Sequence, residues 1–436
     1  MEDFSTKKVT LKNFFLLWFG QSLSQLGSSM TSFALIIWAY KQQGTVMSIA
    51  LLSVFSYLPC ILISLFAGAV IDRFQKKKIM LICDTIAAMC TICAFTAISF
   101  GILQVWHLYF INAISGVMNA FQSPVSKVVI TLIVPKEHYI NVSGLRSLSD
   151  SIISVFNPVL ATTIISFFGI STVFVIDLMT FFVAFLSLLL LVKIPKSITP
   201  EMNNFTESNL INESLQGFNY LKKNIGFLYL MLFMAGINFL AAMAFFSVLP
   251  VMVLSRSSGN EQILGLVNSA IGVGGIVGSL LVSIIKPTNN KVKMIFVSVA
   301  LSFLLCDIFL GVGRNPYIWV LAAFAGNLPI PFLNAAENSL LQLKIPTDIL
   351  GRIFSIRGSI QFITLPIGYL AGGFLADKVF EPLMSNSTKA QSLLGHIVGS
   401  GKGSGMAVIF VITGILGFTL SIISYKNKFI RELDNC

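Results

Sequence analysis

Residues 61–78 read ILISLFAGAVIDRFQKKK, an apolar run that ends in an Asp-Arg pair and three consecutive lysines. The apolar part lacks the alternation of polar and apolar residues that is typical of a strand in a membrane β-barrel. A helix of about 20 apolar residues is long enough to cross the hydrocarbon core of a bilayer. The stretch therefore predicts the end of a membrane-spanning helix and a basic loop that follows it.

Similar apolar runs cover most of the chain. Its 436 residues are 55% hydrophobic and 11% charged, and the mean hydropathy is +0.86, whereas soluble domains contain about 25% charged residues. We therefore predict an all-α membrane protein whose twelve transmembrane helices form two six-helix, pseudo-symmetric halves. The predicted spans are residues 14–40, 46–71, 79–100, 105–133, 141–168, 171–193, 227–254, 262–286, 293–313, 316–343, 351–377 and 405–425.

The longest polar interval suggests the domain organisation. We predict an N-terminal six-helix half over residues 1–193, a cytoplasmic linker with a short amphipathic helix over 194–226, and a C-terminal six-helix half over 227–436. Repeated halves, with a cargo site near the bilayer midplane, are a common design of secondary transporters.

An internal repeat supports the two halves. Pro135 and Pro346 are 211 residues apart, and so are Arg146 and Arg357. Both pairs occupy the same place in a span–loop–span unit, which predicts that spans four and five correspond to spans ten and eleven.

The net charge of +11 has an explanation in membrane topology. With the N-terminus placed inside, the inner segments hold 20 Lys and Arg residues and the outer loops hold 6. Basic residues concentrate on the cytoplasmic loops of membrane proteins, so no nucleic-acid partner is needed to explain the charge. The excess of lysine over arginine, 22 to 7, is typical of an AT-rich bacterial genome. We predict a multi-pass protein of the bacterial cytoplasmic membrane with both termini in the cytoplasm.

Polar side chains recur at intervals of three and four residues in three of the predicted spans, which places each set on one helix face. Such a face lines a wet cavity or forms hydrogen bonds between helices. We favour the cavity, because spans one, four, seven and ten are equivalent under the predicted repeat. The candidate cargo-binding residues are Gln21, Gln25, Ser28, Asn112, Asn119, Gln122, Asn238, Asn334 and Asn338.

Charged residues inside membrane spans are costly and are functional candidates by default. Arg146 and Asp150 are four residues apart on the fifth predicted span, so they form either an ion pair or a proton-carrying site. Glu337 lies in the tenth span with no cation within one turn of its own helix. It is either an unpaired carboxylate that carries a proton or binds a cationic cargo, or a hydrogen-bonded side chain that stays neutral, and we favour the first. These three residues are the candidates for proton coupling. Asp177 is assigned a structural role.

The basic loop carries a more specific signal. Gly68 and Asp72 are one turn apart, where the glycine permits close packing and the aspartate suits the N-terminus of a neighbouring helix. The motif resembles the signature loop between spans two and three of the major facilitator superfamily. The resemblance implies a gate that braces the two halves in one access state, with the start of span eleven, near residues 350–352, as the partner. The gate candidates are Gly68, Asp72, Arg73, Lys76 and Lys77.

A second copy of this pattern occurs late in the chain. The sequence Gly373-Phe-Leu-Ala-Asp377-Lys378 has the same spacing of glycine and aspartate. It lies on the predicted outer side of the membrane, so we assign it no gating role.

The whole chain, over about residues 10–425, resembles the macrolide-efflux-like exporters of that superfamily. Leu350-Gly-Arg-Ile-Phe-Ser355 and Pro366-Ile-Gly368 are among the residues that carry the resemblance. It implies a twelve-span transporter that exports lipophilic drugs in exchange for protons. Two positions depart from the family pattern: Asn112 replaces the arginine of many proton-driven members, and Asn157-Pro158 replaces a Gly-Pro pair.

The predicted function is export of small amphipathic or lipophilic compounds, such as macrolide-like drugs, by proton antiport through alternating access. The alternatives are an exporter of an endogenous metabolite, such as a siderophore or peptide-like product, and a non-transporting membrane sensor. The sequence shows no nucleophile–base set, metal-ligand cluster or phosphate-binding glycine loop. We therefore expect no enzyme, no metal site and no cofactor, with a proton gradient as the energy source. The expected partners of this presumed monomer are the lipid bilayer, protons and one small amphipathic substrate.

Overall fold

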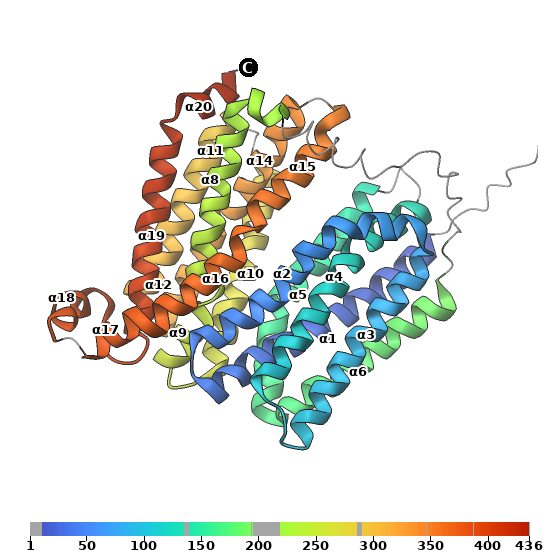
Figure 1. Ribbon diagram of the computed structural model, residues 1–436, viewed down its shortest axis with the longest axis horizontal. Coiled ribbons are helices and arrows are strands. Elements are labelled where there is room, and N and C mark those ends of the chain that lie inside the picture. Colours follow the sequence, from blue (N-terminus) through green and yellow to red (C-terminus); the bar gives the residue numbers. More distant parts are fainter. Residues whose placement is uncertain are drawn as a thin grey trace, which may run out of the picture. The chain divides into compact units, whose positions relative to one another are not determined.

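The computed structural model describes residues 11–134, 139–192, 194, 219–285, 290–345, 347–386 and 388–435. Within these ranges every regular element is a helix (Figure 1), which confirms the predicted all-α class. The chain forms two compact units, which comprise Met1–Trp38 with Phe55–Met202 (unit 1) and Ala39–Val54 with Asn203–Cys436 (unit 2). Most of the predicted linker and its amphipathic helix lie outside the described residues, so the predicted domain boundaries stay a prediction.

Unit 1 is built from long helices joined by short turns. Gly169, with φ +81°, separates two of them by a single residue, because this backbone conformation is accessible to glycine and rare for other residues. The helices are α1 (Leu11–Gln43), α2 (Val46–Arg73), α3 (Lys76–Ser99), α4 (Val105–Ile133), α5 (Tyr139–Phe168) and α6 (Ile170–Leu186), which continues as the π-helical η2 (Ser187–Leu191).

Unit 2 contains shorter pieces that follow one another along each predicted span. They are α8 (Ile225–Ala241), η3 (Ala242–Phe246), α9 (Leu249–Arg256), α10 (Glu261–Ile284), α11 (Lys291–Ser302), η4 (Phe303–Ile308), α12 (Phe309–Val312), α13 (Pro316–Asn327), α14 (Ile330–Lys344), α15 (Thr347–Phe362), α16 (Thr364–Phe374), η5 (Leu375–Phe380), α17 (Glu381–Asn386), α18 (Thr388–Val398), α19 (Ser404–Tyr425) and α20 (Lys428–Asn435). The η segments are π-helical, a form that is often found at functional sites as a single wide turn.

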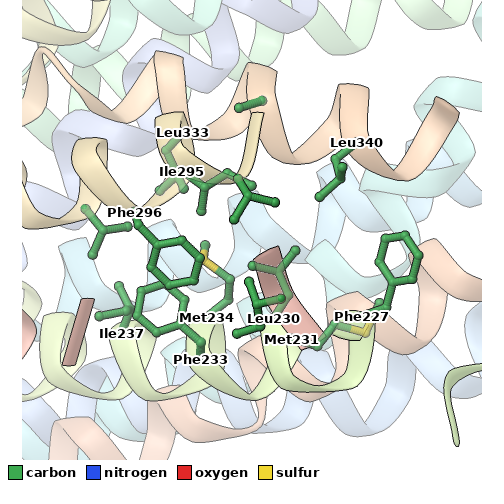
Figure 2. Close-up of a cluster of buried hydrophobic side chains, with 14 of the residues drawn as sticks. Phe227, Leu230, Met231, Phe233, Met234, Ile237, Ile295, Phe296, Leu333 and Leu340 are labelled. Carbon is green, nitrogen blue, oxygen red and sulfur yellow. The ribbon is translucent and has the colours of Figure 1, made fainter. Parts of the chain in front are cut away.

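An apolar cluster holds α8, α11 and α14 together (Figure 2). The rings of Phe233 in α8 and Phe296 in α11 have centroids 4.5 Å apart. Leu333 and Leu340 of α14 complete the cluster. Because lipid is as apolar as these side chains, the cluster stabilises unit 2 through close packing rather than through removal of apolar surface from water.

Glycines allow the closest approaches between helices. A Cβ atom at Gly116 of α4 would lie 2.1 Å from the carbonyl oxygen of Ser56 in α2. A Cβ atom at Gly372 of α16 would lie 2.1 Å from the carbonyl oxygen of Met243 in η3. These positions therefore require glycine for packing, whereas a Cβ atom at Gly275 of α10 would meet nothing within 4 Å.

Ten stretches of the described residues are long and apolar enough to cross a membrane. The helices α1 and α4 are not among them, although they have 33 and 29 residues. At a rise of about 1.5 Å per residue both are long enough to cross a bilayer. Their polar stripes lower their hydropathy, so the count of twelve spans stays a prediction.

Candidate functional site

A cavity of about 900 Å³ lies within unit 1. Its wall combines aromatic side chains, including Trp18, Phe33 and Phe181, with polar side chains of α1 and α4. Cavities that bind small molecules are mostly apolar and carry a few polar groups that orient the ligand. The predicted cargo-binding residues that line it are Gln21, Gln25, Ser28, Asn119 and Gln122.

The polar stripe of α1 meets a carboxylate from each of three other helices. The hydrogen bonds run from Gln21 Nε2 to Asp84 of α3 (3.0 Å), from Gln25 Nε2 to Asp150 of α5 (3.3 Å) and from Ser28 Oγ to Asp177 of α6 (2.9 Å). All six residues line the cavity. The two explanations of the stripe, cavity lining and bonding between helices, therefore hold for the same side chains.

Asp84 binds amides from two different helices. Its Oδ1 accepts a hydrogen bond from Gln122 Nε2 of α4 at 2.9 Å, and the same amide donates to Gln21 Oε1 at 3.2 Å. Asp84 is not among the residues predicted from the sequence. The rule that selected Asp150, a carboxylate inside a predicted span, would also have selected Asp84 in span 79–100.

Several polar atoms of the cavity residues have no partner among the described residues. They are Trp18 Nε1, Gln122 Oε1 and Asn157 Oδ1, all of which are buried. A buried polar atom without a hydrogen bond costs about 1–3 kcal/mol.

Asp177 joins three helices. It is 2% exposed and accepts hydrogen bonds from Ser28 Oγ and, at 3.0 Å, from Thr91 Oγ1 of α3. Gly27 packs directly beside it, since a Cβ there would lie 3.1 Å from Asp177 Oδ1. These contacts agree with the structural role that we expected, although Asp177 also lines the cavity.

Arg146 and Asp150 both line the cavity, but in the part of the chain that the structure describes no ion pair joins them. Lys127 of α4 lines the same cavity. The cavity wall therefore carries three carboxylates and two basic side chains within one space.

Glu337 differs from the prediction in one respect. It is 1% exposed, and its carboxylate accepts hydrogen bonds from Arg357 Nη2 at 2.6 Å and Gln361 Nε2 at 2.8 Å. The expectation that Glu337 is an unpaired carboxylate is wrong, because the cation comes from α15, a different helix. Arg357 Nη1 also donates to Asn338 Oδ1 at 2.7 Å.

The remaining asparagines have separate environments. Asn112 Nδ2 donates to the carbonyl oxygen of Leu108 within α4, at 2.9 Å, and Asn112 does not line the cavity. Asn238 Nδ2 donates to the carbonyl oxygen of Gln361 at 3.3 Å, next to Glu337. Asn334 is exposed on α14. Of the predicted set of nine, five line the cavity of unit 1 and two, Asn238 and Asn338, belong to the network around Glu337, whereas Asn112 and Asn334 belong to neither group.

The side chains of Gly68, Asp72 and Arg73 lie outside the described set, and so do those of residues 350–352. The predicted gate contact of Asp72 is therefore not described. The structure does describe the two lysine side chains of the predicted gate. Lys76 is buried, and Lys77 Nζ donates to the carbonyl oxygens of Leu189 (3.0 Å) and Val192 (2.8 Å). A lysine suits carbonyl groups at a helix C-terminus, because these carry partial negative charge.

Comparison with known proteins decides the family. The model of the transmembrane secretion effector family (MFS_3) matches residues 7–400. The chain belongs to this family. It is therefore a multi-pass membrane transporter of the major facilitator superfamily, and the resemblance seen in the sequence is confirmed.

Individual relatives of this transporter have different cargoes. Macrolide efflux protein A of Streptococcus pyogenes is 25% identical over 387 residues, which cover 87% of this chain and 92% of that protein. The staphyloferrin A transporter of Staphylococcus aureus is 22% identical over 265 residues, which cover 58% of this chain and 62% of that protein. The solved nucleoside transporter NupG has a TM-score of 0.68 at 15% identity, over 97% of this chain and 100% of that chain, and shows the fold alone.

The two halves of this transporter use the repeated arginine differently. In unit 2, Arg357 binds Glu337 and Asn338. The same separation of 211 residues places Ser126 and Lys127 at the positions equivalent to Glu337 and Asn338. Arg146 thus has no carboxylate at the equivalent place, and it lines the cavity.

A further carboxylate that the sequence analysis missed lies in unit 2. Asp307 of η4 is 5% exposed and accepts a hydrogen bond from Thr413 Oγ1 of α19 at 2.9 Å. Because it lies in a packed contact between helices, we assign it a structural role.

Proposed function

We propose that this transporter exports small amphipathic or lipophilic compounds, macrolide-like drugs among them, by proton antiport through alternating access. The observation that carries the proposal is the cavity of unit 1, where aromatic side chains and hydrogen-bonded carboxylates share one wall. An amphipathic molecule needs both kinds of surface. The similarity to a macrolide efflux protein over most of the chain supports the direction and the class of cargo.

The proposed proton-coupling residues are Glu337, Asp150 and Arg146. Among the described residues, Asp150 accepts one long hydrogen bond, from Gln25 Nε2 at 3.3 Å, and it shares the cavity with Arg146. Glu337 lies in the buried ion pair with Arg357, which protonation of the carboxylate would break. A charge change inside a membrane protein alters the stability of each access state, so these groups can link proton movement to cargo movement.

The proposed location is the bacterial cytoplasmic membrane, with both termini in the cytoplasm and a monomer as the working unit. The excess of basic residues on the predicted inner segments supports this orientation. The cavity of unit 1 would then receive its cargo from the cytoplasm or from the inner leaflet.

The proposal is tested by measuring intracellular accumulation of a macrolide and of a lipophilic cationic dye in cells with and without the transporter. We expect lower accumulation in cells that express it, and we expect a protonophore to remove the difference. Equal accumulation of every compound in both cell types, at verified expression, would contradict drug export.

Asp84→Asn should discriminate between cargoes. Because Asp84 has hydrogen-bond partners but no cationic partner among the described residues, its charge is available to a cationic cargo. We expect a loss of about tenfold in the export of the cationic dye, a change that corresponds to about 1.4 kcal/mol, with a smaller loss for an uncharged compound of similar size. A matched control is Asp307→Asn, which replaces a buried carboxylate that does not line the cavity. Equal losses for both compounds would assign Asp84 a structural role.

A second function, export of a polycarboxylate metabolite such as a siderophore, is favoured by Lys127 and Arg146, which line the cavity. The similarity to a staphyloferrin A transporter supports this alternative. The variant Lys127→Gln separates the two: it should abolish export of a polycarboxylate siderophore and leave export of the macrolide within twofold of wild type. The reverse pattern would exclude the alternative.

A further inference from the structure

Two helices belong to both units of the transporter. The last residues of α1 and the first residues of α2, together Ala39–Val54, belong to unit 2, whereas the rest of both helices belongs to unit 1. Neither helix is interrupted at the boundary. Any movement of one unit against the other must therefore bend both helices or release residues 39–54 from unit 2.

A carboxylate of unit 2 holds the start of α2. Asp377, in the π-helical η5, accepts hydrogen bonds from the backbone N–H groups of Val46 (3.0 Å) and Met47 (2.8 Å). These N–H groups lie in the first turn of α2. The N–H groups of a first helical turn have no carbonyl acceptor within their own helix, and this end of a helix carries partial positive charge. One turn before Asp377, Gly373 packs against α2, because a Cβ atom there would lie 2.9 Å from Met47 Cα.

Two further polar contacts bind the end of α1 to unit 2. The hydroxyl groups of Tyr40 and Ser255 are 2.8 Å apart and share a hydrogen bond. Lys41 forms an ion pair with Glu261 at the start of α10. The hairpin between α1 and α2 is thus attached through side chains of η5, α9 and α10.

The apolar part of this attachment is small. The described cluster that includes this segment contributes Ala50 and Val54, which pack with Ala242, Leu365 and Tyr369. The core of unit 2 is formed by many larger side chains (Figure 2). A cavity of about 730 Å³, lined by Thr45, Met47 and Asp377 among others, gives water a path to the polar contacts. An attachment that is mainly polar, small and reachable by water can separate without exposing a large apolar surface.

We infer that Asp377 and Gly373 form a releasable latch on residues 39–54, at the end of α2 opposite the basic loop. The first copy of the pattern Gly-x-x-x-Asp, Gly68 and Asp72, lies near the end of α2. The aspartate of the second copy, Asp377, binds the start of the same helix. Gly373 allows close approach and Asp377 binds a helix N-terminus. The sequence predicts the same two roles for Gly68 and Asp72 in the first copy. This inference departs from the sequence-based expectation, which gave the second copy no gating role.

Hydrogen–deuterium exchange of the full-length transporter in lipid nanodiscs tests the latch. Val46, Ser48, Ile49 and Ala50 are buried in unit 2, so their amides exchange through release of the segment. We expect Asp377→Ala to accelerate exchange roughly fivefold across residues 46–54, since loss of a helix-capping carboxylate shifts such an equilibrium by about this factor. Gly373→Ala should give the same pattern without any change of charge.

Two matched variants serve as controls. Glu381→Ala removes a carboxylate that accepts hydrogen bonds from Gly403 N (2.6 Å) and Gly405 N (3.1 Å) and, among the described residues, none from residues 39–54. Gly275→Ala adds a methyl group where nothing lies within 4 Å. Neither should change exchange across residues 46–54. If Asp377→Ala accelerates only Val46 and Met47, or if Gly373→Ala has no effect, the contact is a local helix cap and the latch is excluded. The readout needs no cargo, so it stands or falls independently of drug export.

Discussion

Glu337→Gln is expected to abolish proton-driven export and also to lower the amount of folded transporter. The substitution removes the negative partner of Arg357 in a buried pair whose closest N–O distance is 2.6 Å. Removing one member of a buried ion pair destabilises a protein by about 3–5 kcal/mol, because the other charge stays buried without compensation. Thermal unfolding of the purified variant and export driven by an imposed pH gradient measure the two effects.

The double variant Glu337→Gln/Arg357→Gln separates stability from coupling. Two neutral amides of similar size can hydrogen-bond to each other, so we expect most of the folded protein to return. Export should stay insensitive to the imposed gradient, because neither group then changes charge. Gradient-driven export at the wild-type rate in the double variant would show that proton coupling depends on another residue, of which Asp150 is the first to test.

Gly372→Ala is expected to prevent normal packing of α16 against η3. The added Cβ atom would lie 2.1 Å from the carbonyl oxygen of Met243 and 2.4 Å from Ser247 Oγ. Overpacking of this kind costs about 1–3 kcal/mol, and more where backbone must move. The melting temperature of the purified protein and its yield in the membrane should both fall.

Gly275→Ala provides the matched comparison, because it places the same methyl group in a helix where the space is open. We expect its melting temperature to equal or slightly exceed that of wild type, since alanine restricts the unfolded chain more than glycine does. Similar melting temperatures for the two variants would mean that α16 and η3 can move apart at little cost.

The sequence predicted the features that depend on one helix at a time. Apolar runs predicted the helices, and the spacing of Gln21, Gln25 and Ser28 predicted a shared polar face. These inferences need the helical period alone. The stripe residues do lie together on the cavity of unit 1.

The features that depend on pairs of helices were missed or wrong. The partner of Glu337 lies 20 residues away on α15, and the amides that bind Asp84 come from α1 and α4. A single sequence does not state which helices are neighbours. The contact of Asp377 was not predicted for the same reason, because its partner Val46, at the start of α2, is 331 residues earlier in the chain.

The polar stripes of α1 and α4 have a consequence for biogenesis. During synthesis α1 reaches the translocon before any of the helices that supply Asp84, Asp150 and Asp177, so its amides and hydroxyl groups first meet lipid without these partners. A segment of such low hydropathy partitions poorly by itself, whereas α2 is among the ten strongly apolar stretches. We expect α1 to enter the bilayer together with α2 and to reach its final position once α3, α5 and α6 have been made. A chain shortened to its first helix should therefore insert poorly into the membrane, although in the finished unit the same helix binds α3, α5 and α6.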